Sequence, residues 1–256
     1  MLNVEPTVLV ELERASIASS RRPGALCLEG IDWRISKGDY WIVGGGEGAG
    51  KTDLLAAASG LQRPAQGTLR LSGQDIAFLG EAELLAARLR LGLVLNNGGR
   101  MFSHLTAAES VVLPLRYHQN LPFPKALEMS KDLLEATGLA EYAHVTPGLL
   151  SASWQQRLGL ARALVLRPEV LFLDEPLAAL ESRHRRWWLD FLDQLAAGAP
   201  FMGGQPMTLV VATNDLTYWP TQGNRFALVR NQRFEVLRDR ANLEKAQAQM
   251  DAQTAS

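Results

Sequence analysis

The chain has 256 residues, of which 47% are hydrophobic and 21% are charged, and its formal net charge is −1. These values are typical of a soluble globular protein with one large or two small domains. Because the net charge is close to zero, the chain has no electrostatic field of one sign that would attract nucleic acid. The single cysteine, Cys27, excludes an internal disulfide, and no apolar run approaches the roughly 18 residues that cross a membrane. We expect no signal peptide, because the first residues alternate like a strand and lack a basic start.

A glycine-rich loop follows a short apolar run at Tyr40–Val43. It matches G-x-x-x-x-G-K-[ST] from Gly45 to Thr52, and apolar residues at helical spacing continue to Gly60. A phosphate-binding loop requires this strand–loop–helix order. Glycine N–H groups and the helix N-terminus attract phosphate oxygens, while Lys51 reaches the β- and γ-phosphates and Thr52 holds Mg²⁺. The residues expected at the nucleotide are Gly45, Gly46, Glu47, Gly48, Ala49, Gly50, Lys51, Thr52 and Asp53, although the pattern does not explain the acids Glu47 and Asp53.

A second apolar run, Val170–Leu173, predicts a parallel strand that is covered on both faces. Asp174 and Glu175 follow at its carboxyl end, where α/β sheets bind their ligands. In a phosphate-loop enzyme the first acid completes the Mg²⁺ shell, and the second polarises the attacking water. We therefore expect Asp174 to be a metal ligand and Glu175 to be a catalytic residue.

The basic segment Ser182–Gly198 predicts a surface helix. A nucleic-acid patch is the alternative, since four basic residues open the segment. Apolar side chains at helical spacing favour a helix that buries one face against the core. We therefore expect no nucleic-acid partner. The side chains expected in that core are Trp187 or Trp188, with Phe191, Leu192 and Leu195.

In this order the motifs resemble the nucleotide-binding subunit of an ABC transporter, over roughly residues 5–240. The stretch Leu91–Leu115 is similar to the Q-loop and the start of a helical lobe, and Leu150–Arg157 is similar to the signature region. Ala179–Glu181 resembles the D-loop, and Thr208–Asp215 occupies the switch position. The sequence HLTAAESVVLPL is also similar to ATPases of bacterial lipid-trafficking systems that work with MCE-type proteins.

Several positions depart from the pattern of that family. The signature reads LSASW instead of LSGGQ, so that Ser151 is retained while Ala152 and Ser153 replace glycines. Trp154 replaces the glutamine, and Glu181 replaces the D-loop aspartate.

The nucleotide contacts that the resemblance implies are also altered. The Q-loop glutamine aligns with Asn96 and the switch histidine with Asn214. No aromatic residue lies at Ile17–Arg22, where an adenine-stacking residue is expected, and Arg21 or Arg22 could stack through its guanidinium plane instead. The residues implied are Thr52, Asp174 and Asn96 for metal, Glu175 and Asn214 for catalysis, and Ser151 and Ser153 for a nucleotide held by a second chain. Because γ-phosphate contacts have changed, we expect Mg²⁺ and ATP binding with slow or partner-dependent hydrolysis.

The resemblance implies an α/β fold, a P-loop NTPase of the ABC ATPase type, with a mixed sheet core, an antiparallel β subdomain and an inserted helical lobe at about 85–160. A single ABC ATPase domain is expected over residues 1–240, followed by a polar tail at 241–256. The antiparallel β structure is expected to come from Val8–Ile35 and from a hairpin at Arg225–Leu237.

The resemblance also implies partners. A second ABC ATPase domain would complete the site, with a homodimer as the simpler default and a heterodimer as the alternative. A separate integral membrane permease would place the chain in the cytoplasm, on the inner face of the cell membrane, and the substrate would be a lipid or another hydrophobic molecule. Two other functions are compatible with the residues: a regulatory or soluble ABC-type ATP-binding protein with little turnover, and a soluble ABC ATPase that remodels nucleic acid or ribosomes.

Overall fold

Alternating apolar residues near the N-terminus form a sheet with one buried face. In the computed structural model, which describes residues 6–245 and 248, Val10, Leu12 and Ile17 are buried on the first strand. That strand, β1, pairs antiparallel with β2 and β4, as the predicted antiparallel subdomain requires. The strands of this sheet, in the order β2-β1-β4-β5, are β1 (Val8–Ala18), β2 (Leu26–Ser36), β4 (Gln66–Leu71) and β5 (Gln74–Asp75).

Continuous apolar runs form the centre of a second, mainly parallel sheet. Every residue of β3, β7 and β8 is buried, because helices or the antiparallel sheet cover both faces. The order is β10-β9-β3-β8-β7-β6, and only the β9–β10 pair is antiparallel within the described residues. The strands are β3 (Tyr40–Gly45), β6 (Leu91–Val94), β7 (Val170–Asp174), β8 (Thr208–Thr213), β9 (Arg225–Arg230) and β10 (Arg233–Leu237).

The hairpin expected at Arg225–Leu237 forms, but it belongs to the main sheet. β9 pairs in parallel with β3, and β10 is the edge strand beyond it. The physical reason is that Phe226–Val229 is an apolar, buried run, which suits a sheet covered on both faces. The antiparallel sheet instead gains β4 and β5, which the sequence had not assigned.

Helices cover the main sheet on both faces. α1 (Lys51–Ala58) shares a core with β1, β2 and β3, so it lies between the two sheets. The predicted helix at Ser182–Gly198 forms as α7 (Ser182–Ala197). It buries Trp188, Phe191, Leu192 and Leu195 in a second hydrophobic core, separate from the one that contains α1. α2 (Glu81–Leu89) precedes β6.

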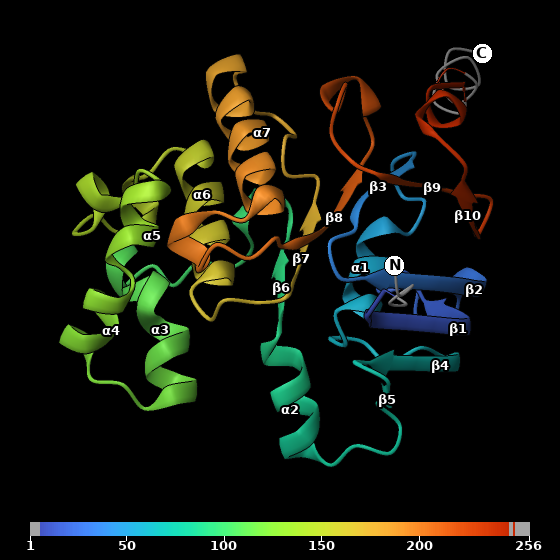
Figure 1. Cartoon of the computed structure of the whole chain (residues 1–256), viewed down its shortest axis with the longest axis horizontal. Coiled ribbons are helices and arrows are strands. Elements are labelled where there is room, and N and C mark those ends of the chain that lie inside the picture. Colours follow the sequence, from blue (N-terminus) through green and yellow to red (C-terminus); the bar gives the residue numbers. More distant parts are fainter. Residues whose placement is uncertain (1–5, 246–247, 249–256) are drawn as a thin grey trace, which may run out of the picture.

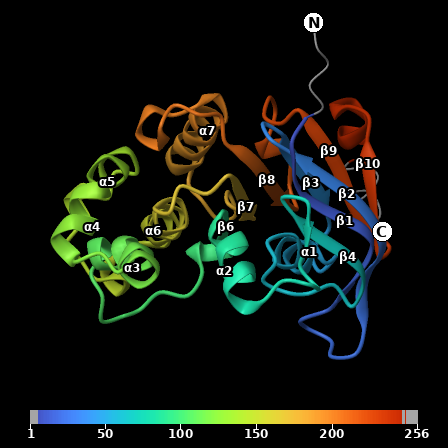
Figure 2. The ribbon, with the colours of Figure 1, turned by 60° about the horizontal axis from the view of Figure 1, so that its bottom comes forward.

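A helical lobe lies on the opposite side of the main sheet from the antiparallel sheet (Figures 1 and 2). Its helices are α3 (Ala107–Gln119), α4 (Phe123–Met129), α5 (Lys131–Ala136) and α6 (Ala152–Leu164). The 3₁₀ turns are η1 (Asn96–Gly98), η2 (Ala140–Tyr142), η3 (Pro147–Leu149), η4 (Pro200–Met202) and η5 (Leu216–Tyr218). Leu91–Val94, inside the 85–160 range, is a strand of the main sheet. The polar tail predicted at 241–256 lies outside the described residues, except for 241–245 and 248.

No helix among residues 6–245 and 248 combines the length and apolar character that crossing a bilayer requires.

The turn η1 touches α6 backbone to backbone. A Cβ built on Gly159 would lie 2.4 Å from the Gly98 carbonyl oxygen, and one on Gly98 would lie 2.5 Å from the Gln155 carbonyl oxygen. The Arg162 guanidinium holds the same segment, because Nη1 donates to the Arg100 carbonyl oxygen at 2.9 Å. The segment that follows β6 is therefore fixed to the middle of α6.

We expect Gly159→Ala to lower the free energy of unfolding by about 1–3 kcal/mol, because the added methyl group forces the backbones of η1 and α6 apart. Thermal or urea unfolding of the purified chain measures this. Gly148→Ala is the matched control, since a Cβ at Gly148 meets nothing within 4 Å. Equal stability of the two variants would contradict the close contact.

Candidate nucleotide-binding site

The glycine-rich loop joins β3 to α1 and turns sharply at its last glycine. Gly50 is the N-cap of α1 with φ 103°, a left-handed conformation that side chains rarely adopt. A Cβ at this position would also lie 3.3 Å from Cys27 Cβ. The loop therefore packs against β2, and the first N–H groups of α1 remain free to bind an anion.

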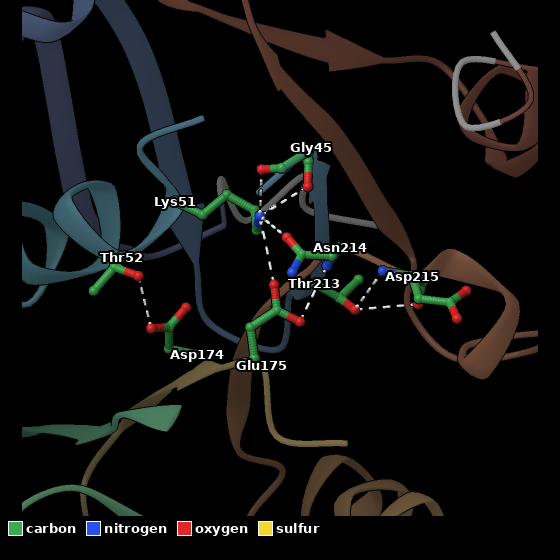
Figure 3. A network of polar contacts seen from close by, with 9 residues as sticks. Gly45, Lys51, Thr52, Asp174, Glu175, Thr213, Asn214 and Asp215 are labelled. Atoms are coloured by element: carbon green, nitrogen blue, oxygen red, sulfur yellow. Dashed lines mark hydrogen bonds and ion pairs between the residues drawn. The ribbon is translucent and has the colours of Figure 1, made fainter. Parts of the chain in front are cut away.

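Lys51 is buried, and its ammonium group is held by four neighbours (Figure 3). Nζ donates to the carbonyl oxygens of Gly45 at 2.7 Å and Gly46 at 3.0 Å, and to Asn214 Oδ1. It also lies 3.4 Å from Glu175 Oε1. Burial lowers the pKa of Lys51, and the Glu175 carboxylate opposes this effect. Protein acceptors therefore already satisfy the three N–H donors of Lys51, and a phosphate ligand would have to replace some of these hydrogen bonds.

Asp174 ends β7 and receives a hydrogen bond from Thr52, whose Oγ1 lies 2.8 Å from Oδ2. The other carboxylate oxygen, Oδ1, is buried without a hydrogen-bond partner. Burial raises the pKa of Asp174, and the Thr52 hydroxyl partly offsets this. An orphaned carboxylate oxygen beside a hydroxyl fits a divalent cation.

That cation would need ligands from outside the protein. Within the described part of the chain, no group of three or more His, Cys, Asp or Glu side chains is arranged to hold a metal. Mg²⁺ commonly takes one or two protein oxygens and completes its shell with water and substrate phosphates. Thr52 and Asp174 would therefore hold Mg²⁺ only together with a bound polyphosphate.

Glu175 follows Asp174 in a strained backbone conformation, with φ 50°. Its Oε2 accepts a hydrogen bond from the Asn214 backbone N–H at 3.1 Å, which points the carboxylate at Lys51. Burial raises the pKa of Glu175, and the Asn214 hydrogen bond acts against it. A partly desolvated carboxylate of raised pKa, held in one orientation, can accept a proton from a water molecule.

A cavity of about 330 Å³ opens over these groups. The predicted residues that line it are Asn96, Glu47, Gly48, Gly50, Lys51, Thr52, Asp53, Asp174, Glu175 and Asn214. Gly45, Gly46 and Ala49 do not line it, but the carbonyl oxygens of Gly45 and Gly46 accept hydrogen bonds from Lys51. Ser19, Ser20, Arg21, Cys27 and Leu95 line the cavity too. Of these the sequence suggested only Arg21, because nothing local marks a β2 residue such as Cys27 as a neighbour of the loop.

The two signature serines do not join this cavity. Ser151 is the exposed N-cap of α6, and Ser153 lies in the first turn of that helix. Trp154, at the glutamine position, packs within 4.5 Å of the Tyr142 ring and 4.6 Å from the Arg157 guanidinium. The tryptophan therefore packs α6 against its own lobe, while Ser151 is exposed and Ser153 is half-buried at the start of the helix.

Comparison with known proteins agrees with this geometry. The sequence profile of the family described as "ABC transporter" matches residues 28–178. The methionine import ATP-binding protein MetN of Rhizobium etli is 36% identical over 167 residues, which cover 65% of this chain and 46% of that protein. The macrolide export ATP-binding/permease protein MacB 1/2 of Paracoccus denitrificans is 35% identical over 188 residues, covering 73% of this chain and 27% of that protein.

A solved structure shows the same arrangement. The dimeric ATP-binding cassette MJ0796, in a post-hydrolysis state bound to ADP and Pi, superposes with a TM-score of 0.78 and 25% identity, covering 90% of this chain and all of that one. The chain therefore belongs to the ABC transporter family and has its P-loop ATPase fold. It spans about half the length of the methionine importers that it matches.

We expect the Cys27 thiol to resist alkylation. Burial, reinforced by the Asp53 carboxylate, raises the pKa of Cys27 to about 12, so the thiolate at pH 8 is at least about a hundredfold scarcer than for a free cysteine. Mass spectrometry of iodoacetamide-treated protein measures the rate, with the urea-unfolded chain as the control. Equal rates in the folded and unfolded chains would contradict this environment.

Proposed function

We propose that this chain is the ATP-driven subunit of a membrane transporter, and that it binds Mg²⁺ and ATP and couples them to a separate integral membrane permease. The observation that carries the proposal is the convergence of Lys51, Thr52, Asp174, Glu175 and Asn214 at one cavity. They come from three segments at one edge of the main sheet: the start of α1, the end of β7 and the residues just after β8. Together they would supply a cation for the phosphates, metal ligands, a base and an amide donor.

The roles of the residues follow from their positions. Lys51 leaves the Gly45 and Gly46 carbonyl groups to meet the β- and γ-phosphates, and Thr52 with Asp174 holds Mg²⁺. Glu175 orients the attacking water, since its carboxylate is desolvated and fixed by the Asn214 N–H. Asn96 lines the same cavity and is the third proposed metal contact, through its amide oxygen.

Two neutral amides explain why we propose slow hydrolysis. Asn214 can donate a hydrogen bond to the γ-phosphate but cannot carry a positive charge as a histidine can. Asn96 is one methylene shorter than glutamine. The loss of a single transition-state donor typically costs about a hundred- to a thousandfold in rate.

We further propose that the site is completed by a second ABC ATPase domain. Ser151 and Ser153 lie outside the cavity of their own chain but are accessible at the start of α6. In a dimer each pair would face the phosphates held by the other chain. The dimeric cassette MJ0796 supports this arrangement, and a homodimer is the simpler form.

The proposed domain is a single ABC ATPase unit over residues 1–240, with α3–α6 as the lobe that meets the permease. A permease partner would place the chain on the cytoplasmic face of the cell membrane. The proposed substrate is a lipid or another hydrophobic molecule, on the resemblance of the HLTAAESVVLPL segment to lipid-trafficking ATPases. The relatives compared above are named for methionine import and macrolide export.

A regulatory ATP-binding protein with little turnover is the second candidate function. The observation that favours it is Asn214, whose side chain holds Lys51 and lacks the charge of a histidine. Both functions require ATP binding, and they differ in whether a membrane partner stimulates turnover.

We expect Lys51→Ala to abolish ATP binding and Glu175→Gln to retain it while removing hydrolysis. The first variant loses the ammonium group that would bind the phosphates. The second keeps a side chain of the same size but has no carboxylate to act as a base. Isothermal titration with Mg²⁺ and ATP, followed by phosphate release on the same preparations, separates the two effects. Unchanged binding by Lys51→Ala would refute the nucleotide site.

We expect the isolated chain to hydrolyse ATP at well below about one turnover per second, within the slow end of enzyme rates. Addition of its co-purified permease in lipid should raise the rate at least about tenfold if the chain is a transport subunit. Rapid turnover without a partner would contradict the proposed loss of γ-phosphate contacts. A rate that no membrane partner changes would favour the regulatory function.

A further inference from the structure

A second cavity opens at the edge of the main sheet opposite the nucleotide site. It lies at the amino ends of the parallel strands, where the segments that lead into β3, β6, β7 and β8 meet, and its volume is about 470 Å³. Pockets for small molecules span roughly 300–1,000 Å³, so this volume is large enough for one. The cavity shares no lining residue with the one that contains Lys51.

One wall of this cavity is apolar. Leu9, on β1, and Met207, directly before β8, line it and are buried, as is Pro168. Met202, in the turn η4, lines it too and is half-buried. The apolar part of a ligand would be removed from water against this wall, and the two flexible methionine side chains can adapt to its shape.

The charged side chains around this wall leave an excess of positive charge. Arg90 and Glu169 line the cavity but neutralise each other, because Nε and Nη2 of Arg90 donate to the two carboxylate oxygens at 2.9 and 2.8 Å. Lys37 and Arg167 line it as well, are exposed, and form no ion pair in the part of the chain that the structure describes. Two cations therefore remain available to an anionic ligand.

Arg167 has a backbone conformation that arginine disfavours. It follows α6 with φ 55°, and its N–H donates to the Leu164 carbonyl oxygen at 2.8 Å. Helices often end on such a left-handed residue, but glycine or asparagine usually fills the position because either adopts this conformation at lower cost. Gly203 leaves room for the guanidinium, since a Cβ there would lie 3.3 Å from Nη1. Strained residues at a cavity are typical of ligand-binding sites.

We propose that this cavity binds a small carboxylate that carries an apolar body. Arg167 and Lys37 hold the carboxylate, because the planar guanidinium matches its two oxygens and the ammonium group adds a second positive charge. The wall of Leu9, Met202 and Met207 covers the apolar body. This site is separate from the nucleotide site and does not rest on the function proposed for it.

Ligand-observed NMR titration of the full chain tests the proposal, with octanoate as the probe. Acetate keeps the charge without the apolar chain, and 1-octanol keeps the chain without the charge. The parent chain is expected to bind octanoate saturably in about the millimolar range, as a ligand of about ten non-hydrogen atoms can. Acetate and octanol should each bind at least about tenfold more weakly, since each lacks one half of the interaction.

Arg167→Asn separates binding from folding. Asparagine adopts the left-handed conformation more easily than arginine, so the melting temperature should stay the same or rise, while octanoate affinity should fall at least about fivefold. Arg14→Asn is the matched control, because Arg14 has a similar φ of 45° but does not line this cavity. It should act on the melting temperature in the same direction and change octanoate affinity by less than about twofold.

Lys37→Gln is an independent second variant, because it removes the ammonium group at an exposed position. It should weaken octanoate binding at least about threefold.

The inference is overturned if octanol or acetate binds as tightly as octanoate, or if Arg167→Asn and Arg14→Asn have equal octanoate affinities. A parent chain that shows no saturable octanoate signal up to about 20 mM overturns it as well. None of these measurements involves ATP, so a failure of this site is distinguishable from a failure of the nucleotide site.

Discussion

The parallel pairing of β3 with β8 and of β8 with β7 determines where the chemistry lies. In parallel strands the carboxyl ends meet at one edge, so the loop after β3, the acids at the end of β7 and Asn214 after β8 come together. The register confirms this, since Gly44 pairs with Thr213 and Asp174 pairs with Ala212. Without that register, Lys51 would be a buried ammonium group without its carboxylate, an arrangement that costs several kcal/mol.

The cavity is also linked to the helix that carries the signature serines. Asn96 lines the cavity, and Gly98, two residues later, touches the α6 backbone so closely that neither Gly98 nor Gly159 can carry a side chain. Any rotation of α6 must therefore carry the 96–98 turn with it, or break this contact. A metal or phosphate held at Asn96 and a second chain facing Ser151 would thus act on the same rigid piece of the lobe, which is the physical condition for coupling between two sites.

Local patterns predicted the parts of this structure that a short segment determines. The phosphate loop, the buried strand before Asp174 and the amphipathic α7 follow from glycine spacing, apolar runs and helical periodicity. Pairings between distant segments were not predictable in that way. The Ser20–Asp53 contact joins residues 33 positions apart, and the place of β9 beside β3 depends on which of several apolar runs occupies the centre of the sheet. The inward direction of Trp154 likewise depends on Tyr142 and Arg157, which no single motif contains.

Asn214 also contributes to the balance of charge around Lys51. An imidazolium at that position would repel the ammonium group, whereas the asparagine oxygen accepts a hydrogen bond from it. The same residue donates its backbone N–H to Glu175, so one segment after β8 restrains both the Lys51 ammonium group and the Glu175 carboxylate. In the proposed nucleotide site, a triphosphate would compete with the Asn214 oxygen for Lys51, and the amide would add no charge beside the phosphates. The asparagine thus holds the Lys51 ammonium group in the ligand-free site and, in the proposed mechanism, would supply no cation to the transition state; these are two separate physical effects.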